Sequence, residues 1–254
     1  MDQPNADLTR WQDPLPQLRQ ALAEDQFVLY CQPIRALAGA SGYPLAEVLV
    51  RMREEEQALL PPGEFLPVFE HYGMMPQLDR WVVDHTLRKL AAGSKVPRFS
   101  VNVSAQTLED AEFARFVAGA VRERAVPADR MLFEIDEADA LSQASLCARF
   151  AAQIKPIGCG IMLEGFGRRA VSFEPLKTVR ADFIKIDGSI TRGVLKSEAA
   201  SKKMQAMVRV SDTLGIGTIA ECVEDQDVLT RIRALGVGHA QGFGILEPRS
   251  IDVI

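Results

Sequence analysis

From residue 98 onward, the chain alternates short apolar segments with amphipathic segments of helical length. Short apolar segments that are bounded by glycine or polar residues and separated by helices are typical of buried parallel strands. We therefore predict strands at residues 99–103, 131–135, 217–221 and 239–241, one ending at Glu164 and one holding Lys185. The helices of this part are predicted at residues 112–124, 142–155, 173–178, 198–214 and 226–235.

The first part of the chain departs from this alternation. Residues 15–24 have the apolar spacing of a helix, and residues 27–34 and 44–52 are predicted strands joined by a glycine-containing turn at 38–43. Two strands this close in sequence leave no room for a crossover helix, so they must pair antiparallel. A loop at residues 53–57 and 61–62 follows, and then predicted helices at 63–71 and 77–90.

The order of these elements predicts the fold. Repeated strand–helix units of about 25–35 residues imply parallel strands with right-handed crossovers, and about eight such strands imply a closed barrel. We predict an α/β protein with a TIM-like (β/α)8 barrel whose first strand pair is antiparallel. The barrel domain is expected to span residues 15–254, after a flexible segment or linker at residues 1–14.

The composition is ordinary for a globular protein with a sizeable core, since 47% of the 254 residues are hydrophobic and 25% are charged. The net charge of −5 argues against a nucleic-acid binder, which would usually be basic. No apolar run approaches the ~20 residues that span a bilayer, and the N-terminus lacks the features of a signal peptide. The four cysteines show no CxxC spacing, and we expect buried free thiols in a reducing compartment. These features predict a cytoplasmic protein.

Polar residues recur at the ends of the predicted strands, and in a barrel the strand ends would bring them to one mouth. Carboxylates and an asparagine amide are hard oxygen ligands for Mg²⁺, Mn²⁺ or Ca²⁺, while Lys185 and Arg51 could bind a phosphate. The pattern predicts a metal-dependent phosphoester site. The alternatives are a set of satisfied polar caps and, for Lys185, a structural ion pair with Asp187 or Glu164. The eight strand-end residues are Gln32, Glu47, Asn102, Glu134, Glu164, Lys185, Glu221 and Gln241.

Several motifs in register resemble the EAL domain, a phosphodiesterase family that opens cyclic di-GMP to the linear dinucleotide. The resemblance runs from about residue 15 to residue 248. It rests on FVLYCQPI, on EVLVR, on the helical segment PPGEFLPVFEHYGMMPQLDRWVV, and on SVNVS, FEIDE, FIKID, IAECVE and AQGF. The family also resembles a TIM barrel whose first strands run antiparallel.

The resemblance implies roles for individual residues. It implies that Lys185 holds the water nucleophile or the phosphate, that Lys185 and Glu221 are the catalytic pair, and that Arg51 grips a phosphate. Gln241 would lie near the metal site, and Glu137 would anchor the loop that follows the carboxylates. The implied metal ligands are Glu47, Asn102, Glu134, Glu164 and Glu221. The implied ligand contacts, guanine contacts among them, are Gln32, Leu49, Arg51, Asp79, Asn102, Lys185, Glu221, Glu224, Gln241, Gly242 and Phe243.

One loop departs from the family pattern. The family's DDFGTGYSS reads EGFGRRAVS here, so Glu164 replaces the first aspartate and Gly165 the second. A two-metal mechanism needs ions about 3.5–4 Å apart, and Gly165 has no side chain with which to hold one. Arg169 stands where the family has a glycine, and because arginine disfavours φ > 0 we expect another loop path. Arg168 beside it would contact phosphate or be a solvated loop charge.

These departures suggest a degenerate EAL domain that binds cyclic di-GMP without efficient hydrolysis and acts as a receptor. Binding would require no cofactor, and Mg²⁺ or Mn²⁺ would serve only a residual activity. The resemblance implies a PilZ-type adaptor that controls type IV pili as a partner, and GGDEF or sensory domains upstream. We favour a monomer.

Three other functions remain open at this point. The first is a weakly active phosphodiesterase that uses Glu164 and one or two ions. The second is an interaction module that has lost nucleotide binding, which the retained Arg51, Asn102 and Gln241 disfavour. The third is a Schiff-base aldolase built on Lys185. Surrounding carboxylates would keep that lysine protonated and unreactive.

Overall fold

The computed structural model describes residues 14–39, 42–53, 59–169 and 171–254. The predicted flexible segment at residues 1–14 lies outside the described residues except for Pro14. The predicted turn at 38–43 and the predicted loop at 53–57 lie partly outside them. In the part of the chain that is described, no helix combines the length and apolar character that crossing a membrane requires.

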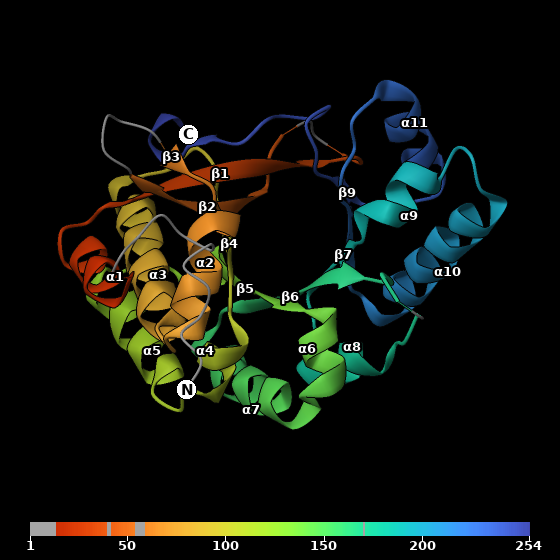
Figure 1. Ribbon diagram of the computed structural model, residues 1–254. Coiled ribbons are helices and arrows are strands. Elements are labelled where there is room, and N and C mark those ends of the chain that lie inside the picture. Colours follow the sequence, from red (N-terminus) through yellow and green to blue (C-terminus); the bar gives the residue numbers. More distant parts are fainter. Residues whose placement is uncertain (1–13, 40–41, 54–58, 170) are drawn as a thin grey trace.

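The strands form one 10-stranded sheet that closes on itself (Figure 1). Its strands are β1 (Phe27–Ala36), β2 (Leu45–Arg53), β3 (Leu59–Leu60), β4 (Phe99–Asn102), β5 (Met131–Asp136), β6 (Gly160–Phe166), β7 (Phe183–Ile186), β8 (Gly217–Ala220), β9 (His239–Ala240) and β10 (Arg249–Ser250). The ring runs β1-β2-β4-β5-β6-β7-β8-β9, with β3 and β10 attached at its edges. Neighbours are parallel from β2 to β9, whereas β1 is antiparallel to both β2 and β9. The predicted barrel with an antiparallel first strand pair is confirmed.

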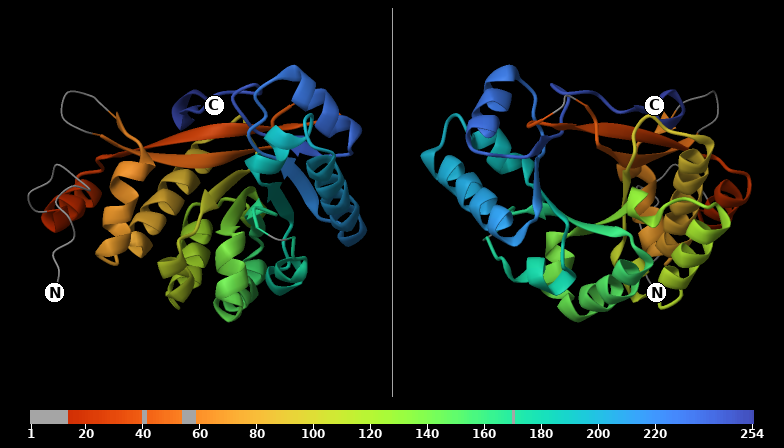
Figure 2. Two further views of the ribbon diagram at one scale, coloured as in Figure 1. Left: turned by 45° about the vertical axis from the view of Figure 1, so that its right-hand side comes forward. Right: turned by 180° about the vertical axis from the view of Figure 1, so that it is seen from behind.

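Helices cover the outside of the barrel, as the two views of Figure 2 show. They are α1 (Pro14–Ala23), α2 (Pro62–His71), α3 (Met75–Ala92), α4 (Ala105–Glu109), α5 (Phe113–Glu123), α6 (Glu137–Ser142), α7 (Ala144–Ile154), α8 (Glu174–Val179), α9 (Gly188–Gly193), α10 (Glu198–Leu214) and α11 (Gln226–Ala234). The α10 bounds equal the predicted ones, because a long amphipathic stretch is bounded by the Ser197 cap and by left-handed Gly215.

Some elements differ from the prediction. The helix predicted at 142–155 is α7, whereas α6 before it was not predicted. Helix α6 begins where Asp136 caps it by accepting a hydrogen bond from the Ala138 amide. Strand β6 continues through Phe166 instead of ending at Glu164. The short elements α4, α9, β3 and β10 were not predicted, since a few residues carry no readable periodicity.

Successive residues of a strand point to opposite faces of the sheet, so residues two apart on a strand both point into the barrel. Inside the barrel these side chains form two layers. The lower layer is a buried apolar cluster of Ile34, Leu45, Leu132, Met162 and Ile219 with Phe183 against it. Two positions along each of these strands, toward the mouth, stands a polar residue such as Glu47, Glu134 or Lys185. The alternation thus places an apolar floor beneath a polar layer.

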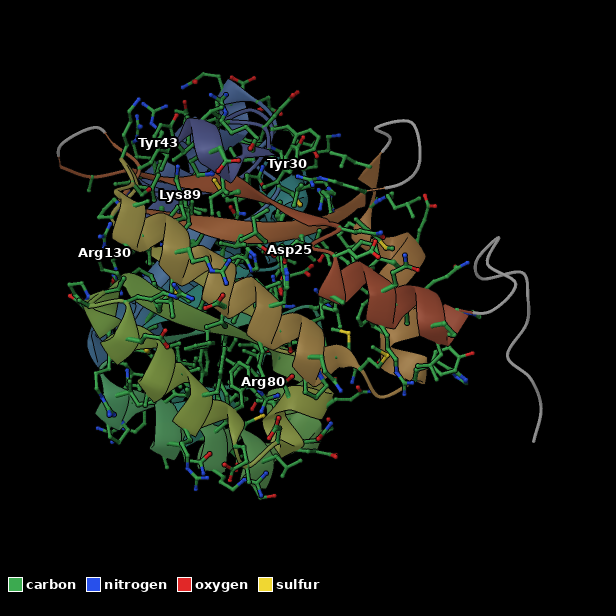
Figure 3. All side chains as sticks on the ribbon, turned by 90° about the vertical axis from the view of Figure 1, so that its left-hand side faces the viewer. Asp25, Tyr30, Tyr43, Arg80, Lys89 and Arg130 are labelled. Atoms are coloured by element: carbon green, nitrogen blue, oxygen red, sulfur yellow. The ribbon has the colours of Figure 1, made fainter. Side chains whose placement is uncertain are left out.

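A second cluster lies between the β1–β2 hairpin and helices α1, α2 and α3, which are seen side-on in Figure 3. The Phe27 ring lies 5.7 Å from that of Phe65, 5.8 Å from that of Phe69 and 5.5 Å from that of Trp81. Trp81 Nε1 also donates to Asp25 Oδ1 at 2.7 Å, just after α1. Leu18 of α1 is fully buried here, so the predicted first helix packs against the barrel through this cluster.

Candidate active site and adjoining pocket

Lys185 of β7 is the centre of the polar layer, and only 1% of its side chain is exposed. Its Nζ lies 2.8 Å from Glu47, 2.9 Å from Glu134, 3.2 Å from Glu221 and 3.5 Å from Glu164. Burying an ammonium group is costly unless nearby charges and hydrogen bonds compensate it, and here four carboxylates do so. Asp187, which the sequence also offered as a partner of Lys185, pairs with Arg168 instead.

Amides complete this layer. Gln241 Nε2 donates to Glu47 Oε2 at 2.7 Å and to Gln32 Oε1 at 3.1 Å. Asn102 Nδ2 donates to Glu47 Oε1 at 3.1 Å. Every strand-end residue that the sequence singled out is therefore linked, directly or through one neighbour, to the Lys185 cluster. The prediction that these residues converge on one mouth is confirmed, although their assigned roles remain predictions.

Burial and charge shift the pKa values of the cluster. Burial raises the pKa of Glu134 to about 8 and that of Glu221 to about 7, although the Lys185 ammonium opposes both shifts. Burial also disfavours the charged form of Glu47, but Lys185 and its hydrogen bonds bring that pKa below its usual range. Burial would lower the pKa of Lys185, yet the surrounding carboxylates raise it well above its usual value. A lysine held protonated in this way is a poor nucleophile, which argues against the aldolase alternative.

The cluster fits one hard divalent cation. Carboxylate oxygens of Glu47, Glu134 and Glu164 lie within 4.8 Å of one another. Glu134 Oε1 is buried and has no hydrogen-bond partner among the described residues. Oxygen donors at this spacing suit Mg²⁺ or Mn²⁺, and these three residues would hold the ion. An ion bound there would polarise a phosphoryl oxygen or lower the pKa of a water molecule.

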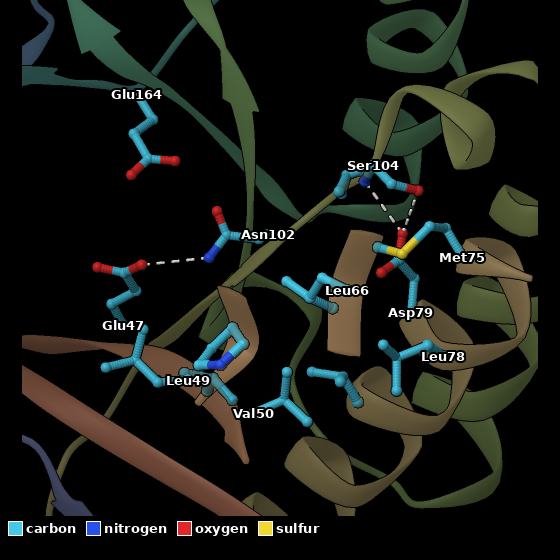
Figure 4. Close-up of a pocket in the computed structure, with 14 residues that line it drawn as sticks. Glu47, Leu49, Val50, Leu66, Met75, Leu78, Asp79, Asn102, Ser104 and Glu164 are labelled. Carbon is cyan, nitrogen blue, oxygen red and sulfur yellow. Dashed lines mark hydrogen bonds between the residues drawn. The ribbon is translucent and has the colours of Figure 1, made fainter. Parts of the chain in front are cut away.

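A pocket of about 330 Å³ adjoins the cluster (Figure 4). At its far end Asp79 is buried, and its Oδ2 accepts hydrogen bonds from Ser104 N, Ser104 Oγ and Thr107 Oγ1 at 3.0, 2.8 and 2.6 Å. Burial raises the pKa of Asp79 despite these bonds. Sequence reasoning missed Ser104, although a serine before a short helix is a cap signal. The lining residues are Glu47, Val48, Leu49, Val50, Pro62, Leu66, Met75, Leu78, Asp79, Val82, Asn102, Val103, Ser104 and Glu164.

Eight of the predicted ligand contacts do not line this pocket. Gln32, Lys185, Glu221 and Gln241 belong to the polar layer, and the other four are Arg51, Glu224, Gly242 and Phe243. Arg51 lies further along β2, where its guanidinium is 5.9 Å from the centre of the Tyr30 ring and Nη1 donates to the Val50 carbonyl. Glu224 is exposed, and so is Phe243. A Cβ on Gly242 would lie 2.3 Å from the backbone of Val223, so only glycine allows this close approach. Their predicted ligand contacts stay predictions.

The loop after β6 is held by several polar contacts. The register between β6 and β7 shifts between Leu163 and Phe166, and this irregularity contains Gly165 with φ 66°. Glu137 accepts from the Gly167 amide at 3.1 and 3.0 Å, which is the position expected of a loop anchor. Left-handed backbone occurs here at Gly165 and Gly167 and not at Arg169. The expectation that this loop takes another path than in the family stays a prediction.

Arg168 forms ion pairs that the sequence analysis did not predict, while its phosphate contact stays a prediction. Its Nε donates to Asp187 Oδ2 at 2.8 Å, and its Nη1 lies 3.3 Å from Asp136 Oδ2. The hydrogen bond to Asp187 and the charges of Asp136, Asp187 and Glu164 raise its pKa. Arg168 is thus an ion-paired residue and not a fully solvated one, with 53% of its side chain exposed. The sequence missed these pairs because the partners lie 19 and 32 positions away.

Comparison with known proteins agrees with the geometry. The family model "EAL domain" matches residues 16–248. The chain is 30% identical over 237 residues to the cyclic di-GMP phosphodiesterase PdeF of Escherichia coli K12, with 92% of this chain and 31% of that protein covered. It therefore spans about a third of the length of the curated relatives it matches.

Two solved structures are similar over nearly the whole chain. The first is the FimX EAL domain from Pseudomonas aeruginosa bound to c-di-GMP, with a TM-score of 0.88, 27% identity and coverage of 94% of this chain and 97% of that one. The second is the PaMucR phosphodiesterase in complex with c-di-GMP, with a TM-score of 0.85, 28% identity and coverage of 94% and 98%.

Proposed function

The chain belongs to the EAL domain family, and on this basis we propose that it binds cyclic di-GMP at the barrel mouth without hydrolysing it efficiently, as a receptor. The observation that carries this proposal is Gly165. It follows Glu164 at the mouth of a barrel whose other polar residues are in place, and it contributes no carboxylate.

Binding is supported by the pocket and the charges around it. Apolar walls with a few polar groups suit a flat base, and a purine could donate its N–H groups to Asp79 at the far end. Asp79 Oδ1 accepts no hydrogen bond from the described residues, so it is free for such a donor. Arg51, which makes no ion pair among the described residues, would supply positive charge for a phosphodiester, whereas four carboxylates already compensate the charge of Lys185. Structures of two similar domains, FimX and PaMucR, contain c-di-GMP.

The absence of efficient hydrolysis is supported by the ligand count. Activation of a water molecule and stabilisation of the leaving oxygen in a two-metal site need two ions held about 3.5–4 Å apart. Within the described residues, the carboxylates that group closely enough to hold an ion are Glu47, Glu134 and Glu164. Such a group can hold one ion, and Gly165 provides nothing for a second.

A second candidate is a weakly active phosphodiesterase. The specific observation in its favour is the intact arrangement of Lys185 with Glu47, Glu134 and Glu221. One ion on the carboxylate group would supply part of the stabilisation that two ions give. PdeF, a relative with 30% identity, is a cyclic di-GMP phosphodiesterase.

The proposal also includes further domains of the protein and a partner protein. Because the chain spans about a third of its curated relatives, the complete protein would carry further domains, which we propose to be GGDEF or sensory domains. A PilZ-type adaptor of type IV pilus regulation would read the bound state. The site of action would be the bacterial cytoplasm.

The test is a calorimetric titration of the chain with cyclic di-GMP, with and without Mg²⁺, followed by chromatography of the nucleotide. The receptor proposal expects a Kd on the order of micromolar or tighter in both conditions, with intact ligand recovered. Recovery of linear dinucleotide would support the phosphodiesterase instead. No heat of binding in either condition would leave the interaction module.

The double variant Glu164→Asp with Gly165→Asp sharpens this test. A silent receptor starts near zero activity, whereas a weak enzyme should gain rate from a measurable starting value. The wild-type rate, measured at high enzyme concentration with Mn²⁺, therefore separates the two candidates before any variant is made.

A further inference from the structure

Arg168 joins the loops that follow three neighbouring strands, β5, β6 and β7. Its guanidinium bridges Asp187 at 2.8 Å and Asp136 at 3.3 Å. Each aspartate also caps a helix with its other oxygen, Asp136 through the Ala138 amide and Asp187 through Ser189. The two carboxylates are therefore fixed by backbone hydrogen bonds before Arg168 meets them, and they hold the guanidinium in one place.

That place is the space over Gly165. A Cβ on Gly165 would lie 2.7 Å from Arg168 Nη2 and 3.0 Å from Cζ. The guanidinium thus fills the volume that a side chain at this position would enter, next in sequence to Glu164. The charge of Glu164, one member of the Glu47–Glu134–Glu164 group, acts on Arg168 and contributes to its raised pKa. The same positive charge raises the free energy of a divalent cation bound to Glu164, because like charges repel.

We propose that Arg168 is a built-in cation of the barrel mouth, which tethers the loop after β6 and lowers the affinity of the Glu47–Glu134–Glu164 group for divalent metal. One oxygen of this group is available as a metal ligand, since Glu134 Oε1 is buried without a hydrogen-bond partner among the described residues. Removing the charge of Arg168 should therefore expose a latent ion site. This inference concerns the site of the proposed function but is tested without dinucleotide, so each can fail independently of the other.

Arg169 offers a matched control. It is the next residue of the same loop, its side chain is exposed, and within the described part of the chain it makes no ion pair. Arg168→Ala and Arg169→Ala change the net charge equally. A difference between them reports the position of the charge, not its presence.

The experiment is a titration of Mn²⁺ into the whole chain, in which electron paramagnetic resonance measures the free ion. Arg168→Ala should bind Mn²⁺ about tenfold more tightly than the wild type, and Arg169→Ala should stay within about twofold of it. Arg168→Gln, which keeps a planar donor group without the charge, should show the same gain if Arg168→Ala folds poorly. Adding Glu164→Gln to either Arg168 variant should abolish the gain.

Equal Mn²⁺ affinities for the Arg168 and Arg169 variants would overturn the inference. A gain that survives Glu164→Gln would also overturn it, because the ion would then bind elsewhere.

Discussion

Replacing Lys185 with methionine should destabilise the barrel strongly. The change keeps a long side chain but removes the ammonium that lies 2.8–3.5 Å from Glu47, Glu134, Glu164 and Glu221. Removing one partner of a buried ion pair leaves uncompensated charge and costs about 3–5 kcal/mol. In a domain of this size, 1 kcal/mol shifts the unfolding midpoint by about 2–4 °C, so Tm should fall by roughly 6–20 °C.

The pH dependence identifies the cause of this loss. The pKa of Glu134 is about 8 and that of Glu221 about 7 even with Lys185 present, because burial disfavours their charged forms. Without the lysine, both groups become neutral more readily as the pH falls, and neutral carboxyl groups do not repel one another. The difference in stability between the variant and the wild type should therefore be larger near pH 8 than near pH 5.5.

The assay is thermal unfolding followed by circular dichroism at both pH values, with Lys202→Met as the control. Lys202 pairs with Glu198 at 2.7 Å, but 73% of its side chain is exposed. Its loss should cost no more than about 1 kcal/mol. If Lys185→Met lowers Tm no more than Lys202→Met, or loses more stability at low pH than at high pH, the electrostatic account of the site is wrong.

Three further predictions use other parts of the site. Burial raises the pKa of Glu134, so the folded state holds its proton to higher pH than the unfolded chain and this stability is lost as the pH rises through about 8. Urea unfolding should show that Glu134→Gln loses less free energy of unfolding than the wild type between about pH 5 and about pH 9. Equal losses in the two proteins would refute this. Asp79→Ala removes the acceptor of the half-buried Ser104 donors and of the buried Thr107 hydroxyl, and it should cost about 1–3 kcal/mol in the same assay. A loss below about 0.5 kcal/mol would contradict the network. Gly242→Ala should cost about 2 kcal/mol or more through backbone overlap, while Gly119→Ala in open helix should gain about 0.5–1 kcal/mol, and similar effects would count against the overlap.

Much of the barrel followed from local pattern. The long helix α10 and the first strand pair were predicted because periodicity and a short connection are properties of neighbouring residues. Gln32 and Glu47 do face each other across that pair, as the antiparallel register requires. Elements of only a few residues were not predicted, among them β10, whose strand character depends on pairing with β1.

The chain's own alternation determined which side chains enter the barrel. Residues two apart on a strand share a face, so the polar residues that follow the apolar floor had to meet at one mouth. The same reasoning placed Lys185 among carboxylates and showed that Gly165 contributes no side chain as a metal ligand. These are consequences of local periodicity together with a closed sheet.

Tertiary structure alone decided what surrounds that layer. Arg168 pairs with Asp187, 19 positions away, and with Asp136, 32 positions away, and its guanidinium lies over Gly165. These contacts depend on the path of the loop after β6. No periodic pattern specifies such a path, because it is set by caps, by left-handed glycines and by the Glu137 contact acting together. The sequence therefore determined the polar layer that faces the mouth, and the folded loop decided which cation stands beside it.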